Sequence, residues 1–166
     1  MTTLRRQRRS LHAGFLCLVL SVPAAALLWQ AGHAATTEQI VVDPNSGLAI
    51  YGYDPVAYFT DSAAKMGRSD LELKHAGAAW RFHNESNRDA FARDPDVYMP
   101  QYGGHDPVAI TGNVARAGHP EFWAIYNDRL FLFYSDDARK QFNADPAHMA
   151  LQAEVNWPHV SQTLSP

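Results

Sequence analysis

The chain has 166 residues, 46% of them hydrophobic and 19% charged, and its formal net charge is −3, which excludes an intrinsically disordered chain. The first 34 residues hold Arg5, Arg6, Arg8 and Arg9 and no acid, so the other 132 residues keep 10 of the 14 basic residues against 17 acidic ones, a net charge of −7. This acidic body has the length of one domain and disfavours nucleic acid and anionic lipid as partners.

The first 34 residues have the order of an export signal. Their arginines are followed by an uncharged apolar run from Leu11 to Trp29 and then by small residues, a pattern that predicts a signal peptide cleaved after Ala34. The run also approaches the roughly 20 residues that span a bilayer, so an uncleaved anchor is the alternative. Because the arginines hold the N-terminus inside, both alternatives place the body in the periplasm or otherwise outside the cytoplasm.

The single cysteine of the chain, Cys17, lies inside this apolar run. After cleavage the protein would hold no cysteine at all. The exported part therefore has no disulfide and no thiolate metal site, and its stability must come from its core.

Two stretches of the exported part repeat in the same order. GYDPVA at residues 52–57 returns as GHDPVA at residues 104–109, an offset of 52. At an offset of 51 the matched positions are Trp80 to Phe82 with Phe131 to Phe133, Arg88 with Arg139, Phe91 with Phe142, and Asp94-Pro95 with Asp145-Pro146. We interpret this as an internal duplication, with a first unit at 52–103 and a second at 104–158, preceded by an extension at 35–51 and followed by a tail at 159–166. Two copies are too few for a solenoid and predict a compact pair with pseudo-two-fold symmetry.

Each unit is expected to form a β-hairpin. Asp-Pro-Val at its start predicts a turn, because the residue before a proline avoids the helical region. Two short strands follow, at 71–75 and 79–82 in the first unit and at 122–126 and 130–133 in the second, joined by tight turns. The aromatic residues alternate along the second strand of each pair, which predicts that one face enters the core.

A helix is expected after each hairpin. Asn84 and Ser135 are suitable N-caps, and the acidic residues just after them suit the positive end of a helix. Phe91 and Phe142 then fall on the inward face, and an Asp-Pro pair starts a further helical turn. The sequence thus predicts an α+β fold, a tandem duplication of a hairpin-plus-helix unit.

The duplicated aspartates, Asp54 and Asp106, each stand directly before a proline. Their expected role is an Asx turn, in which the carboxylate accepts a hydrogen bond from the backbone two residues on. A ligand-binding role for the pair is the alternative.

These motifs resemble those of exported YHS-domain proteins: GYDPVAYF at 52–59, RDAFARDPDVYMPQYGG at 88–104, RLFLFYS at 129–135 and NWP at 156–158. The resemblance covers residues 52–158, about 107 of the 132 exported residues. The YHS domain is similar to the TRASH group of small modules, whose cysteines bind copper or other soft metals. The resemblance implies that fold and a non-catalytic role in metal handling, near a transporter, oxidase or similar system.

The positions that hold cysteine in metal-binding relatives hold other residues in this chain. The three positions are Ala57, His83 and Asn87 in the first unit and Ala109, Tyr134 and Ala138 in the second. Exported relatives also carry tyrosine and cysteine after Gln-Tyr-Gly-Gly, where this chain has His105-Asp106. The ligands that remain are imidazole and carboxylate, which suit copper(II) or zinc. If the units pack through their duplicated faces, His83, His105, Asp106 and His119 could converge on such an ion, whereas each histidine taken singly fits a surface or core role.

A metal-free binding module is the second hypothesis. Tyrosines that the core does not need, among them Tyr53, Tyr58 and Tyr102, could line a groove with Asp54 for a peptide or small ligand. The alternative for these aromatic residues is core packing, since matched aromatics usually fill the same pocket in each half. No nucleophile elbow, phosphate loop or dinucleotide fingerprint occurs in the sequence, so we expect no enzyme. The sequence favours copper handling first and a metal-free protein- or small-ligand-binding module second, with a partner in the periplasm and none in nucleic acid or within the membrane.

Overall fold

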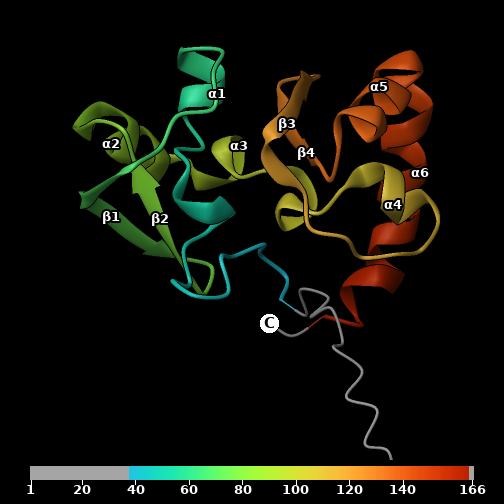
Figure 1. Ribbon diagram of the computed structural model, residues 1–166, viewed down its shortest axis with the longest axis horizontal. Coiled ribbons are helices and arrows are strands. Elements are labelled where there is room, and N and C mark those ends of the chain that lie inside the picture. Colours follow the sequence, from blue (N-terminus) through green and yellow to red (C-terminus); the bar gives the residue numbers. More distant parts are fainter. Residues whose placement is uncertain (1–37, 165–166) are drawn as a thin grey trace, which may run out of the picture. The chain divides into compact units, whose positions relative to one another are not determined.

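The computed structural model describes residues 38–164, and it has a mixed α+β fold (Figure 1). The expected leader, Cys17 and the cleavage site after Ala34 lie outside the described residues. The first set of elements is η1 (Ile50–Gly52), α1 (Ala57–Thr60), β1 (Arg68–His75), β2 (Ala78–Phe82), α2 (Glu85–Arg93) and α3 (Pro95–Tyr98). The second set is η2 (Gln101–Gly104), α4 (Pro107–Thr111), β3 (His119–Tyr126), β4 (Arg129–Phe133), α5 (Asp136–Ala144) and α6 (Pro146–Ser161), so that elements of the same kind follow one another in the same order.

Two separate antiparallel hairpins, β1–β2 and β3–β4, confirm the expected strands. Both begin earlier than predicted, because one further pair forms beyond a register shift, with Arg68 opposite Phe82 and His119 opposite Phe133. Such an irregularity breaks the alternation of polar and apolar residues, which is the sequence signal for a strand. The turns are the predicted ones, and Ala76 and Asn127 adopt left-handed backbone conformations in them.

The helix that follows each hairpin begins where the sequence predicts. The Asn84 side chain accepts a hydrogen bond from the Asn87 backbone N–H at 2.8 Å, and Ser135 caps α5 in the same way. Phe91 and Phe142 are completely buried, each against aromatic residues of its own hairpin. The caps and the inward phenylalanines are therefore confirmed.

Strand β4 separates two hydrophobic clusters. Leu130 and Leu132 belong to the cluster that holds Trp80, Phe82 and Phe91, whereas Phe131 and Phe133 belong to the other cluster. That second cluster consists of Tyr102, Ile110, Phe131, Phe133, Phe142, Ala153 and Val160. The prediction that the aromatic face of β4 enters the core is confirmed, and the opposite face is buried as well, because the first set of elements covers it. Strand β2, in contrast, alternates between buried and half-buried residues as predicted.

The last helix of the first set is short and that of the second is long. Helix α3 ends at Tyr98 because Pro100 forces Met99 into an extended conformation. Helix α6 meets no proline until Pro158 and continues through it to Ser161, so the expected end of the second unit at 158 falls inside a helix. Helices α4, α5 and α6 gather around the β3–β4 hairpin (Figure 1). None of the helices in residues 38–164 has the length and apolar character needed to cross a membrane.

The two sets of elements make direct polar and aromatic contacts. The Tyr58 hydroxyl of α1 donates a hydrogen bond to the Pro120 carbonyl of β3 at 3.0 Å, and its ring packs edge-on against Trp123. The Val41 N–H donates to the Gly103 carbonyl at 2.8 Å. At Gly103, where φ is positive, a side chain would overlap the Gln39 carbonyl, so only glycine fits between η2 and the N-terminal extension.

Candidate functional site

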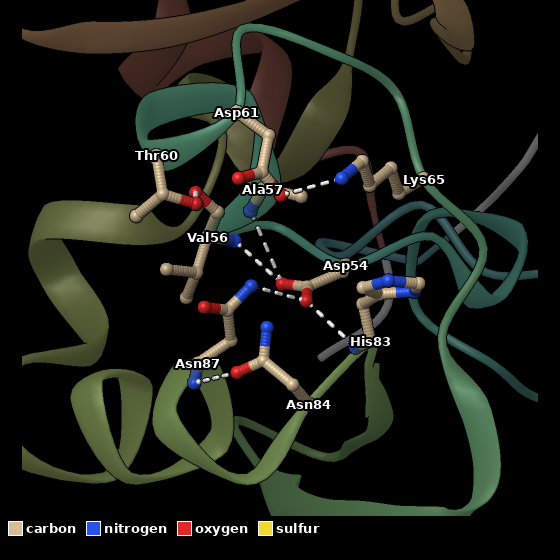
Figure 2. Close-up of polar contacts among 9 residues, drawn as sticks. All are labelled: Asp54, Val56, Ala57, Thr60, Asp61, Lys65, His83, Asn84 and Asn87. Atoms are coloured by element: carbon tan, nitrogen blue, oxygen red, sulfur yellow. Dashed lines mark hydrogen bonds and ion pairs between the residues drawn. The ribbon is translucent and has the colours of Figure 1, made fainter.

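The carboxylate of Asp54 is the centre of a fully buried hydrogen-bond hub (Figure 2). Its Oδ1 accepts hydrogen bonds from the backbone N–H groups of Val56 at 2.8 Å and Ala57 at 3.3 Å. Its Oδ2 accepts from the His83 backbone N–H and from the Asn87 side chain, both at 2.7 Å. One side chain thus ties the start of α1 to the end of β2 and to α2. The predicted Asx turn is confirmed, and the bonds to His83 and Asn87 extend it.

Asp106 forms a smaller hub at the matching place in the second set. Its Oδ1 accepts from the Val108 backbone N–H at 2.8 Å and its Oδ2 from the Tyr134 backbone N–H at 3.1 Å. Ala138 stands where Asn87 stands in the first set, so no side-chain amide completes this hub. Burial raises the pKa of Asp106, against the lowering effect of its backbone hydrogen bonds. Both aspartates are buried polar residues whose oxygens are already bonded within the fold.

His105 lies completely buried between η2 and α4. Its Nδ1 is 2.8 Å from the Tyr102 carbonyl, and because a carbonyl only accepts, Nδ1 carries the proton. Its Nε2 has no hydrogen-bond partner among the described residues. The ring packs 5.7 Å from the Trp157 ring of α6, and burial lowers its pKa. The His105 ring is therefore a neutral, buried imidazole whose Nε2 accepts no hydrogen bond within residues 38–164.

The other two residues of the predicted metal site are exposed and belong to different hairpins. His83 follows β2 and is fixed by its backbone N–H to Asp54, and His119 opens β3. Within residues 38–164 no three side chains of histidine, cysteine, aspartate or glutamate lie close enough to hold a metal ion. The structure does not gather His83, His105, Asp106 and His119 into one metal centre. The side chains of His105 and Asp106 are buried within the second set of elements, whereas those of His83 and His119 are exposed.

The predicted groove residues have mostly become core residues. Asp54 and Tyr58 are at most 1% exposed and Tyr102 is 7% exposed. The Tyr102 hydroxyl donates a hydrogen bond to the Ala150 carbonyl of α6 at 3.2 Å, as that of Tyr58 does to Pro120. Tyr58 and Tyr102 therefore pack in the core, as the alternative hypothesis predicted. Of the predicted groove residues, only Tyr53 is half-buried at the surface.

An aromatic patch at the junction between the two sets of elements combines Tyr53 and His119, which the sequence analysis assigned to different sites, with residues that it assigned to neither. We call it the junction patch: Tyr51, Tyr53, His119, Glu121 and Phe122. The exposed His119 ring lies 6.2 Å from the ring of the half-buried Tyr51 and 5.5 Å from that of Phe122. The Glu121 backbone N–H donates to His119 Nδ1 at 3.3 Å, which leaves Nε2 to carry the proton of the neutral ring. Aromatic side chains are enriched at protein interfaces, and tyrosine is enriched among the residues that dominate binding energy.

A half-open cavity of about 570 Å³ lies elsewhere, beside the β1–β2 turn. Its walls are Glu38, Gln39, Ile40, Val42, Gly47, Ala76, Gly77 and Ala78. None of the predicted metal or groove residues lines it.

The arrangement can rigidify the chain, since its buried carboxylates are hydrogen-bonded within the fold, and it presents aromatic groups at the surface. Comparison with models of protein families, with curated proteins and with solved structures finds no match for this chain.

Proposed function

We propose that the chain is an exported, non-catalytic binding protein, a duplicated YHS-like module that holds its fold with buried carboxylates and binds a protein or small ligand without metal. This is the metal-free hypothesis of the sequence analysis. The Asp54 hub carries the proposal, and the junction patch suggests where a partner binds.

The hub contacts the positions at which the resemblance places metal ligands. Those positions in the first unit are Ala57, His83 and Asn87, and each donates a hydrogen bond to the Asp54 carboxylate. A soft metal ion needs several thiolate or imidazole donors, and of these three positions only His83 carries one. The groups that face the carboxylate are two backbone N–H groups and an amide, which donate to an anion. The residues present therefore do not fit a metal at this place. The carboxylate joins the same three segments that a metal ion would join.

Metal content tests this proposal directly. The protein is purified without a metal-affinity tag, analysed for bound metal and titrated with copper(I), copper(II) and zinc, and its thermal unfolding is followed with and without a chelator. We expect no stoichiometric metal and an unchanged midpoint of unfolding. Stoichiometric metal whose removal lowers the midpoint would contradict the metal-free hypothesis.

Crosslinking tests the binding role separately. A photo-reactive phenylalanine analogue replaces Tyr53 in the junction patch, and in a matched variant it replaces Tyr134, which is 54% exposed and lies on the second unit. We expect a discrete adduct in the exported compartment from position 53 and none from position 134. Adducts of equal yield from both positions, or none from position 53, would contradict the junction patch as the binding surface.

Copper handling stays a second candidate because His83 and His119 expose imidazole rings at the surface. An exposed imidazole is a suitable copper(II) donor. In residues 38–164 no three side chains of the histidine, cysteine or carboxylate kind lie close enough to hold an ion, so further ligands would have to come from a partner. Titration of a His83→Asn, His119→Asn double variant distinguishes this candidate, since copper(II) binding that survives both substitutions does not use them.

A further inference from the structure

The His105 ring joins η2 to α6 in the second set of elements. Its backbone forms a bridge with Ala117, and its Nδ1–H donates to the Tyr102 carbonyl. On its other side, the Trp157 ring of α6 lies 5.7 Å from His105 and 5.4 Å from Tyr102. Helix α6 thus seals the imidazole from water, and the same helix receives the hydrogen bond of the Tyr102 hydroxyl.

While α6 covers the ring, a second proton on the imidazole is energetically unfavourable. Protonation would place a donor on Nε2, which has no hydrogen-bond partner, and a charge on a residue that is 0% exposed. The ionisable side chains on the segments around it are Tyr102, Asp106, Arg116, Arg129, His148, Glu154 and His159. In the described part of the chain none of their side chains bonds to the His105 ring, and both oxygens of Asp106 are held by backbone N–H groups.

We propose that His105 is an acid-sensitive latch for α6, so that protonation of Nε2 releases this helix from the second hydrophobic cluster. The charged ring is stable only in water, and the shortest route to water is the departure of Trp157 and the helix that carries it. The opening would uncover Tyr102, Ile110 and other apolar residues that α6 covers, while the first set of elements stays folded.

The sign of the pH effect follows from proton linkage. Burial lowers the pKa of folded His105 below its ordinary value of 6.5, so the open state binds the proton first. The closed state therefore loses stability as pH falls through 6.5 towards the lowered pKa, and it keeps its full stability above that window.

Hydrogen exchange at α6 tests the latch in the full chain. Protection of residues 146–161 is measured between pH 7.5 and 5, corrected for the intrinsic pH dependence of exchange and compared with α2 of the first set. We expect protection of α6 to fall by up to about tenfold for each pH unit below 6.5, while that of α2 stays constant. Parallel loss of protection in both helices would overturn the proposal.

Two variants make the test specific. His105→Asn keeps a donor for the Tyr102 carbonyl but has no titrating group, and it should remove the pH dependence of α6. His159→Asn changes an exposed histidine on the same helix and should leave the pH dependence intact. A pH dependence that survives in His105→Asn overturns the latch.

A measurement on the unsubstituted protein keeps the proposal testable if His105→Asn does not fold. The ring resonance of His105 is titrated by NMR alongside the resonances of α6. We expect a His105 pKa below 6.5 and the same midpoint for the α6 resonances. A normal His105 pKa, or an α6 transition with a different midpoint, would show that the ring does not control the helix.

Discussion

The two sets of elements follow the same order of helices and strands but are stabilised differently. In the first, Asp54 receives four hydrogen bonds, and one of them comes from the Asn87 side chain. In the second, Asp106 has no such partner, and α4 is held from outside by α6, where the Asn156 amide donates to the Ile110 and Thr111 carbonyls. A short α3 thus accompanies a complete hub, and a long α6 accompanies an incomplete one. The comparison teaches that a buried polar hub and a covering helix are alternative ways to fix the same loop.

Exchange of each carboxylate for an amide should give the largest difference between the two sets. In Asp54→Asn the new NH₂ group would face two N–H donors and leave them without acceptors inside the core. A hydrogen bond to a charged group contributes about 1.5–3 kcal/mol, so we expect a loss of about 3 kcal/mol or more in the free energy of unfolding. Urea unfolding followed by circular dichroism measures it.

Asp106→Asn is the matched variant for this test. It disturbs fewer hydrogen bonds and removes a carboxylate whose pKa burial raises, so part of the loss is offset. We expect a loss of about 1 kcal/mol, that of one neutral hydrogen bond. Equal losses in the two variants would mean that the number of donors does not distinguish the hubs.

The side-chain amide of Asn87 gives the next largest effect. Asn87→Ala removes a buried donor 2.7 Å from a carboxylate oxygen, and we expect a loss of about 2 kcal/mol in the free energy of unfolding.

The reciprocal change, Ala138→Asn, offers Asp106 the same donor. Because asparagine costs about 0.6 kcal/mol of helix propensity relative to alanine, the expected net gain is below 1 kcal/mol. Thermal unfolding of both variants measures these changes, and a destabilising Ala138→Asn would show that the second hub cannot take up the amide.

The covering helix can be tested through Asn156. Asn156→Ala removes the side-chain amide that donates to the last two carbonyls of α4 at 3.1 and 3.0 Å, while the Ile110 carbonyl keeps the Asn113 backbone N–H as a donor. The substitution should cost about 1 kcal/mol. Hydrogen exchange should show the loss at α4 and leave α1 unchanged. Gln162→Ala, an exposed position just after α6, is the control, and an equal loss there would refute a specific role for Asn156.

Local signals predicted most of the fold, and contacts between distant segments explain the rest. Asn84, Ser135 and the residues of the hairpin turns act over a few positions, so the sequence alone places them correctly. The burial of Leu130 and Leu132 depends on the first set of elements packing against β4, which no local pattern contains. In the site, the Asx turns of Asp54 and Asp106 were predictable from Asp-Pro-Val. The junction patch was not, because Tyr51 and His119 are 68 positions apart in the chain.

The two hairpin turns offer the smallest test of the comparison. Both turns place their first residue in the left-handed region, with φ of 49° at Ala76 and 48° at Asn127. Asparagine tolerates this region and alanine pays a steric cost, so Ala76→Asn should stabilise the protein by about 0.5–1 kcal/mol. Asn127→Ala should destabilise it by a similar amount, and urea unfolding of both variants checks the pair. Because Ala76 is exposed, Ala76→Asn mainly changes the backbone strain of the turn. Effects of opposite sign and similar size would mean that the two turns differ only in their residues, whereas a gain without the matching loss would place the difference in the surrounding strands.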